Sequence, residues 1–313
     1  MKRKLLIAAL VLVLAGAILF LAGVIVNGSA PSPLFTAEER TFVIEEPFTG
    51  IKIDAGSCNI AIEKTDGQAR VETRVCGALN PEIGVRDGVL TVSIDEYMHF
   101  GLHSFSDRIT VYLPDGKCAS ADIEVTSGSV EIGAVSFSGQ LKTEITSGSV
   151  KLDAVSCGGE LSARTTSGAI RLNDVSCRSG LTLETTSGSI RLNAVSCGGE
   201  IKVQTTSGSI ALDAVSTPAG TALTATSGSV TVKDLTAAHL DAKTTSGSIK
   251  LDRCDALTLN LTTTSGSVKG SIVGERVFEC TTGSGSVHVP ETTEGGNCRI
   301  RTGSGSINIE IAE

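Results

Sequence analysis

A Ser-Gly pair, most often within Thr-Ser-Gly-Ser, recurs at a nearly constant interval through residues 121–313 of the 313-residue chain. The interval is 20 residues five times, then 19 residues three times, then 20 residues. The ten pairs begin at Ser127, Ser147, Ser167, Ser187, Ser207, Ser227, Ser246, Ser265, Ser284 and Ser304. A fixed period of this length is the signature of a repeat architecture, so other folds are considered only after it.

Apolar residues occupy fixed positions on both sides of each pair. The third residue after the repeated Ser is Val or Ile in every copy, and the fifth is aliphatic in every copy except at Gly270. Polar residues such as Lys151 and Arg171 stand between these two positions. A second alternating segment precedes each pair, as in residues 161–165. Because apolar and polar residues alternate with a period of two, each repeat is predicted to form two strands with one buried face each.

A unit of two strands cannot bury its apolar face alone, so neighbouring units must stack. The sequence therefore predicts an all-β chain in which residues 121–313 form a parallel β-solenoid of about ten rungs, each 19–20 residues long. Consecutive Ser-Gly turns would then form a column with a spacing of about 4.8 Å. An antiparallel meander, with the Ser-Gly turns as hairpins, is the alternative with the same local pattern.

Residues 41–120 carry similar alternation with less regular spacing, for example around Ile51, Ile53, Ile60 and Ile62. They are interpreted as an irregular β-rich N-terminal cap, which would protect the first rung from exposing an open edge. The stretch 95–107 interrupts the alternation and is the one long loop expected in the chain. Long loops often carry function.

The N-terminus indicates membrane attachment. Residues 1–4 include three cations, and the 22 residues from Leu5 to Val26 carry no charge. As a helix this segment would be roughly 33 Å long, enough to span a bilayer. We expect residues 1–4 to lie in the cytoplasm, residues 5–26 to form a signal-anchor helix, and residues 27–40 to form a short stalk. A cleaved signal peptide is the alternative, although Pro31 follows the small residues that would form its cleavage site.

Several of these features resemble one family. A short membrane anchor, an entry segment from Phe48 to Ile53, the Leu113-Pro114 step and the serial Ser-Gly-Ser units look like the bacterial putative adhesins, a β-strand-repeat family of unknown function. The resemblance covers about residues 41–313. It implies a β-solenoid outside the membrane and, by name only, adhesion. The family pattern contains no catalytic residues to carry over, and relatives also occur beside envelope-stress regulators.

The nine cysteines are an odd number, and several fall in the apolar columns. Cys157, Cys177 and Cys197 occupy the position that Phe137 and Thr217 hold in adjacent repeats. They are interpreted as small buried apolar residues that stay reduced. Neighbouring rungs would also bring these three within disulfide range, so a disulfide is the alternative.

The sequence offers little for catalysis or for metal binding. It has no Gly-x-Ser-x-Gly motif and no recognisable Ser, His and acid set, and His99 and His103 flank Gly101 in a segment without helical periodicity. We therefore expect no enzymatic activity, no cofactor and no metal site. Nucleic-acid binding is also not expected, because the net charge is -8, and without Lys2, Arg3 and Lys4 the chain has 23 basic and 34 acidic residues.

One row of cations contrasts with this acidic balance. The fourth residue after the repeated Ser is basic in five repeats, at Lys151, Arg171, Arg191, Lys250 and Lys269. Stacked like charges repel, so the row needs compensation. The compensation is an external polyanion, such as an anionic polymer of the cell envelope, or pairing with acids of flanking columns, such as Asp153 and Asp213, or simple solvation of the long flexible side chains.

Together these features predict a single-pass protein of the cell membrane that displays a β-solenoid outside the cytoplasm as a binding, adhesive or structural surface. Its partners would be the membrane, through residues 5–26, and an envelope polymer or a membrane protein. An accessory protein in envelope stress or signalling is the first alternative, and a polysaccharide-active enzyme is the second.

Overall fold

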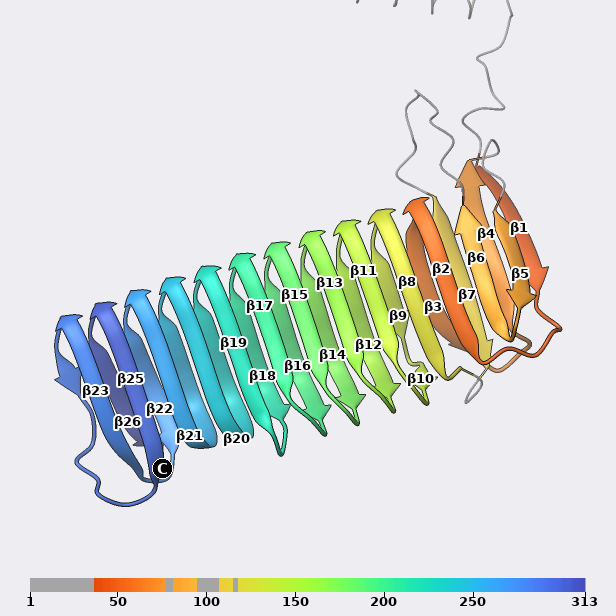
Figure 1. Cartoon of the computed structure of the whole chain (residues 1–313). Helices are drawn as coiled ribbons and strands as arrows, with labels where there is room; N and C mark the ends of the chain where they lie inside the picture. Colours follow the sequence, from red (N-terminus) through yellow and green to blue (C-terminus); the bar gives the residue numbers. More distant parts are fainter. Residues whose placement is uncertain (1–36, 77–80, 95–106, 115–117, 313) are drawn as a thin grey trace, which may run out of the picture.

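The strands of this chain wind into one elongated parallel β-solenoid (Figure 1). The structure is a computed structural model that describes residues 37–76, 81–94, 107–114 and 118–312, and in these ranges it contains strands and no helix. The sequence predicts about ten rungs, whereas the solenoid has about nine. The expected transmembrane helix at residues 5–26 lies outside the described ranges, and no helix within them is long and apolar enough to cross a bilayer.

Each repeat supplies one strand to each of two faces, as the alternation predicts. The first face consists mainly of strands that precede a Ser-Gly turn: β8 (Ser120–Ser127), β11 (Leu141–Ser147), β13 (Leu161–Ser167), β15 (Leu181–Ser187), β17 (Ile201–Ser207) and β19 (Gly220–Ser227). The second face consists of strands that follow it: β9 (Val130–Gly133), β10 (Ser136–Phe137), β12 (Val150–Cys157), β14 (Ile170–Cys177), β16 (Ile190–Cys197) and β18 (Ile210–Ser216). Two long strands, β20 (Val230–Ser246) and β21 (Ile249–Ser265), run from the second face into the first.

The pairing is parallel and one repeat apart. On the first face Ser167 lies opposite both Ser147 and Ser187, and on the second face Leu172 lies opposite both Leu152 and Leu192. Every strand from β11 to β19 pairs in this way with the strand one repeat away. These registers confirm the parallel solenoid and exclude the antiparallel meander for these strands.

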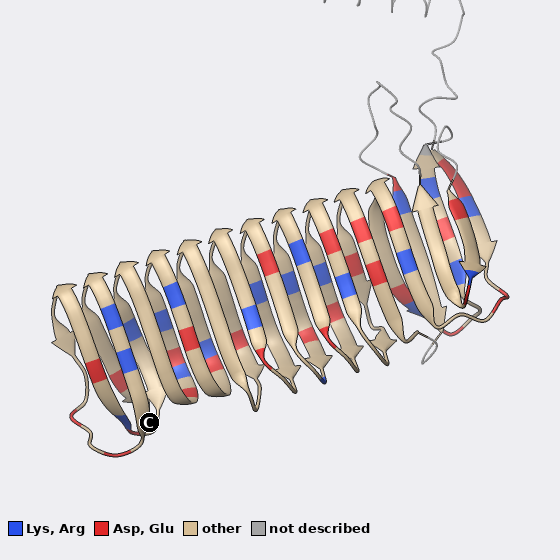
Figure 2. Ribbon diagram, in the orientation of Figure 1, with Lys and Arg blue, Asp and Glu red and all other residues tan. Residues whose placement is uncertain are grey.

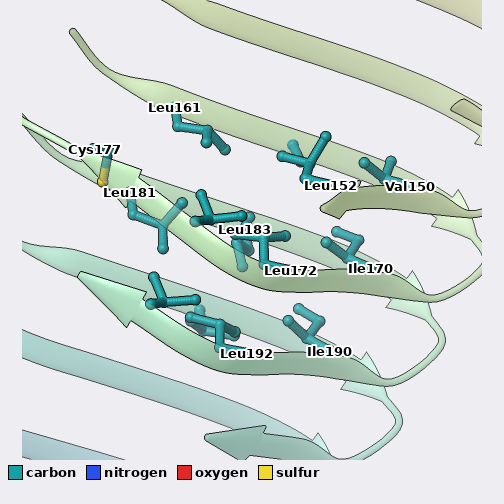
Figure 3. Packing of buried hydrophobic residues seen from close by; sticks show 14 of the residues in the cluster. Val150, Leu152, Leu161, Ile170, Leu172, Cys177, Leu181, Leu183, Ile190 and Leu192 are labelled. Atoms are coloured by element: carbon teal, nitrogen blue, oxygen red, sulfur yellow. The ribbon is translucent and has the colours of Figure 1, made fainter. Parts of the chain in front are cut away.

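The core is a stack of aliphatic layers between the two faces (Figure 3). Ile170, Leu172 and Leu181 are at most 2% exposed, and the same positions are buried in the neighbouring rungs. Since one Leu or Ile side chain contributes about 1.5–3 kcal/mol when it is fully buried, stacking of rungs is the main source of stability.

Glycine is required at the Ser-Gly turn by the close approach of adjacent rungs. Gly148 has a φ of 147°, and a Cβ atom on it would lie 1.7 Å from the carbonyl oxygen of Gly128. No side chain fits at that distance. The repeated Gly therefore reflects contact between rungs as well as backbone conformation.

A second corner bends the strands of the second face. The residue at this bend has a φ between 48° and 54° in seven successive rungs, at Ala134, Ala154, Asp174, Ala194, Ala214, Asp234 and Arg253. The residue before it forms a polar ladder, in which Asn173 donates to Asp153 at 2.6 Å and Asn193 donates to Asn173 at 2.6 Å. Asp and Asn side chains thus form a hydrogen-bonded polar corner on the second face.

The last two repeats do not stack in chain order. β25 (Gly296–Ser304) pairs with both β21 and β23 (Arg276–Ser284). The final repeat is therefore inserted between β21 and the penultimate repeat, which forms the end of the stack (Figure 1). On the second face, β22 (Val268–Val273) pairs with all six residues of β26 (Ile307–Ala312). The outermost strand β24 (Val287–His288) has two residues and stops before Pro290, which has no N–H to donate and suits an edge.

The N-terminal end shows the same exchange. β2 (Gly50–Ser57) lies between β6 (Val89–Ile94) and β8, and β3 (Asn59–Thr65) lies between β7 (Arg108–Pro114) and β9, all in parallel register. The region expected to be an irregular cap therefore continues the solenoid in part. Its antiparallel part consists of β1 (Ala37–Val43), β4 (Arg70–Cys76) and β5 (Glu82–Arg86). β1 begins within residues 27–40, which the sequence assigned to a stalk.

Candidate functional site: a basic row on the second face

The five cations singled out from the sequence lie in one row across the second face. Lys151, Arg171 and Arg191 are direct register partners on β12, β14 and β16. The register continues through Ala211 and Thr231 to Lys250 and Lys269 on β21 and β22. With strands about 4.8 Å apart, the six steps from Lys151 to Lys269 give a row of roughly 29 Å. These five residues are called the basic row below.

All five side chains of the basic row are exposed. Among the residues that the structure describes, none of the five forms an ion pair with a carboxylate. The flanking acids are engaged elsewhere, since Asp153 accepts a hydrogen bond from Asn173 and Asp213 pairs with Lys233 at 3.2 Å. The second explanation offered by the sequence, pairing with flanking acids, is therefore not what the structure shows.

The row has a defined start at its N-terminal end. The residue that continues the register beyond Lys151 is Glu131, whose carboxylate lies 3.6 Å from the guanidinium of Arg108. The row thus begins next to an acid that already has a cationic partner. This arrangement leaves three adjacent cations, then two uncharged positions, then two more cations.

The first face treats its charges differently. Here cations and carboxylates are mixed on β8 to β15, as the red and blue positions in Figure 2 show. Lys142 lies 3.4 Å from Glu144 and 3.5 Å from Asp122, and Arg164 lies 3.2 Å from Glu184. Desolvation lowers the pKa of Lys142, but the two carboxylates Asp122 and Glu144 raise it more, so its pKa lies above its usual value. The charges of Lys142 and Arg164 are therefore compensated within the protein.

The first face also carries a shallow polar groove of about 540 Å³ beside the Ser-Gly turns. One side of it is charged, with Glu124, Glu144, Arg164 and Glu184 on successive strands. The other side is a row of hydroxyls from Thr126, Thr146, Thr166, Thr186 and Thr206. The charged column and the Thr column are two residues apart in each strand and therefore share one face. The groove between them was not predicted from the sequence.

The cysteine column faces inward, as expected. Cys157, Cys177 and Cys197 are 3%, 5% and 2% exposed, at the ends of β12, β14 and β16. Eight cysteines have described side chains, and all eight are free thiols. Burial raises the pKa of the Cys157 thiol. The column therefore fills the corner between the two faces.

The remaining expectations concern the long loop. His99 and His103 belong to residues 95–106, which lie outside the described ranges. Within the part of the chain that the structure describes, no group of three or more His, Cys, Asp or Glu side chains is placed to hold a metal ion.

Several solved structures are similar to this chain over most of its length. A protein described as a putative adhesin from Parabacteroides distasonis is 16% identical, with a TM-score of 0.44 over 88% of this chain and 97% of that chain. A protein described as a putative lipid binding protein from the same species is also 16% identical, with a TM-score of 0.43 over the same shares. A putative adhesin from Bacteroides fragilis is 17% identical, with a TM-score of 0.36 over 89% of this chain and 99% of that chain.

No curated protein matches the sequence. The family described as Toastrack DUF4097 matches residues 48–217 and 199–313, which together include the whole solenoid and most of the cap. The resemblance to a β-repeat family of unknown function is thereby confirmed, and some of the similar solved structures are described as putative adhesins. The chain belongs to the Toastrack DUF4097 family.

Proposed function

We propose that this protein is a membrane-anchored binding protein whose second face holds a linear polyanion along the basic row, outside the cytoplasm. The observation that carries the proposal is the register of Lys151, Arg171 and Arg191, which are exposed and unpaired on adjacent strands. A polymer with repeating negative charge would supply the compensation that flanking acids do not.

The shape of the face favours an extended ligand. The cations follow a line of roughly 29 Å across the second face. A small anion would contact one or two of these cations, whereas an extended chain contacts all five. An anionic polymer of the cell envelope has this form.

The acidic net charge limits the range of this attraction. At 0.1 M ionic strength the Debye length is about 10 Å, so distant acids of the solenoid are largely screened from a ligand lying on the row. The cations in direct contact are not screened in this way. The predicted binding is therefore local, weak at long range and sensitive to salt.

The anchor would place this face next to the envelope. Support for it comes from the uncharged segment Leu5–Val26 and the three cations that precede it. If the segment is a retained anchor, the full-length protein stays with membranes after alkaline carbonate washing. A soluble chain beginning near Ala30 would show that the segment is a cleaved signal peptide.

The experiment that tests polyanion binding is retention on immobilised anionic envelope polymer at low salt. The variant Lys151→Gln with Arg171→Gln and Arg191→Gln should lose most of the retention, with an unchanged circular dichroism spectrum. The matched control is Arg164→Gln with Lys202→Gln and Lys243→Gln, which removes the same charge from exposed sites on the first face. If both variants lost retention equally, the binding would depend only on the net charge of the protein, which would contradict a binding site on the second face.

A further inference from the structure

The cysteine column contains one pair of sulfur atoms that is much closer than its fold requires. Cys177 and Cys197 are register partners at the ends of β14 and β16, and their Sγ atoms are 2.7 Å apart (Cys177 is labelled in Figure 3). A disulfide needs a sulfur separation of about 2.05 Å and Cα atoms about 4.4–6.8 Å apart. Adjacent strands, at about 4.8 Å, meet the second requirement.

The column also gives Cys177 a second neighbour. Cys157 is the register partner of Cys177 on the other side, so the backbone offers Cys177 two equivalent neighbours. The Sγ atom of Cys157 lies 2.9 Å from the carbonyl oxygen of Gly139 and 3.5 Å from that of Glu160. The Sγ atom of Cys197 makes the same kind of contact, 2.9 Å from the carbonyl oxygen of Ser179, so this backbone contact is shared by both neighbours of Cys177. What distinguishes the Cys177–Cys197 pair is the 2.7 Å approach of its two sulfur atoms.

A surface depression of about 530 Å³ lies over this corner. All three cysteines contribute to its lining, together with exposed neighbours such as Arg178. A reagent that enters the depression meets the column from its outer side.

The hydrogen bond within the pair gives the two thiols different roles. Cys177 donates to Cys197, which raises the pKa of Cys177, while accepting this bond lowers the pKa of Cys197. Since the thiolate is the nucleophile in exchange, Cys197 is the residue expected to react first.

We propose that Cys177 and Cys197 are a redox-active thiol pair, which a disulfide oxidant converts into a covalent link between adjacent rungs. In the first step the Cys197 thiolate attacks one sulfur of the oxidant, forming a mixed disulfide and releasing one thiol, which takes up the Cys197 proton. In the second step Cys177 attacks Cys197 Sγ and releases the second thiol with the Cys177 proton. Two electrons pass from the pair to the oxidant, and dithiothreitol reverses the reaction.

This proposal does not depend on polyanion binding. It applies wherever the solenoid meets an oxidising compartment, which exported proteins do. Because the link would join two rungs and close a 20-residue segment, it should make the oxidised solenoid harder to unfold than the reduced one.

Mass spectrometry tests the pairing directly on the full-length chain. After treatment with oxidised glutathione, free thiols are alkylated and the unreduced protein is digested with trypsin. Cleavage after Arg171, Arg178, Arg191 and Lys202 places Cys177 in residues 172–178 and Cys197 in residues 192–202. We expect these two peptides to be recovered joined, and residues 152–164 to carry an alkylated Cys157.

The variant Cys157→Ala should leave the 177–197 link unchanged, whereas Cys197→Ala should abolish it without transferring it to Cys157. The oxidised wild type should also unfold at a higher temperature than the reduced form, with the difference absent in Cys197→Ala. Full alkylation of Cys177 and Cys197 after oxidation would overturn the proposal. Links between Cys157 and Cys177 in equal amount would overturn the selectivity on which it rests.

Discussion

The hydroxyl of Thr165 donates a hydrogen bond of 3.0 Å to the carbonyl oxygen of Gly148, one rung earlier in the solenoid. The same bond recurs along the column at 2.8–3.1 Å, from Thr185 to Gly168, Thr205 to Gly188, Thr244 to Gly228, Thr263 to Gly247 and Thr302 to Gly266. Each threonine is buried, and each glycine carbonyl belongs to a turn whose backbone leaves the strand ladder. The Thr hydroxyl therefore satisfies a carbonyl that stacking would otherwise bury without a partner.

Replacing Thr165 by Val keeps the side-chain shape and removes this bond. The Gly148 carbonyl then lacks its donor, and the free energy of unfolding should fall by about 1–3 kcal/mol. Urea unfolding measures the change. Thr166→Val is the matched control, since Thr166 is exposed and makes no such bond, and it should change stability by less than about 0.5 kcal/mol. Equal effects of the two variants would show that the hydroxyl ladder contributes nothing.

Adding a Cβ at the turn should be far more costly. In Gly148→Ala the new atom would overlap the carbonyl oxygen of Gly128, so the rungs must separate locally. We expect a loss of at least about 3 kcal/mol in urea unfolding. Gly133→Ala provides the comparison, because a Cβ at Gly133 would meet nothing within 4 Å. A stable, fully folded Gly148→Ala protein would contradict the close stacking of the turns.

The exchanged order of the last two rungs predicts which engineered cysteines can be linked. Asn260 and Arg299 are direct partners on β21 and β25, so Asn260→Cys with Arg299→Cys should form a disulfide under mild oxidation. Glu279 lies one strand further out, about 9.6 Å from Asn260. Asn260→Cys with Glu279→Cys should therefore stay reduced. The reverse result would place the rungs in chain order.

Buried thiols predict a loss of stability at alkaline pH. Burial raises the pKa of Cys58, Cys254 and Cys298 from 9.0 to about 12. Above pH 9 these thiols ionise in the unfolded chain but stay neutral in the folded one, so the unfolded state binds fewer protons. The contribution of each thiol to the free energy of unfolding is fully present below pH 9. It decreases by up to about 1.4 kcal/mol per pH unit as the pH rises toward 12.

Thermal unfolding at pH 8 and pH 10.5 measures this dependence. The variant with Cys58→Ala, Cys254→Ala and Cys298→Ala should lose less of its unfolding temperature between the two pH values than the wild type loses. The comparison of differences removes the intrinsic cost of the substitutions. An identical loss in both proteins would mean that these thiols titrate alike in the folded and unfolded states.

Much of the fold could be predicted because one periodic signal repeats in every rung. The column that contains Ile170 and Ile190 and the column that contains Leu172 and Leu192 specified strands, faces and register together. The basic row could be predicted for the same reason, since residues at equal offsets from the turn become neighbours once the pairing is parallel. Residues 1–36 do not belong to the repeat and lie outside the described part of the structure, so the membrane anchor stays a prediction.

Other features depend on contacts that periodicity does not encode. The final rung lies between β21 and β22 on one side and the penultimate rung on the other. Two strands compete to pair with β22: β24 ends before Pro290, whereas β26 is longer and takes the position. This competition depends on three-dimensional pairing and not on the spacing of the repeats. The groove beside Thr166 depends on which columns face outward at the turn. The 2.7 Å approach of Cys177 to Cys197 rests on side-chain direction, which equal spacing leaves open.

The salt dependence of polyanion binding distinguishes binding along the basic row from a general effect of net charge. Binding of anionic envelope polymer is measured at several salt concentrations for the wild type, for the triple Gln variant at Lys151, Arg171 and Arg191, and for the triple Gln control at Arg164, Lys202 and Lys243. Each lost contact between a cation and the polymer should reduce the slope of log affinity against log salt by on the order of one. We expect the second-face variant to have a slope smaller by roughly three, and the first-face control to keep the wild-type slope. Equal slopes for the wild type and the second-face variant would contradict binding along the basic row.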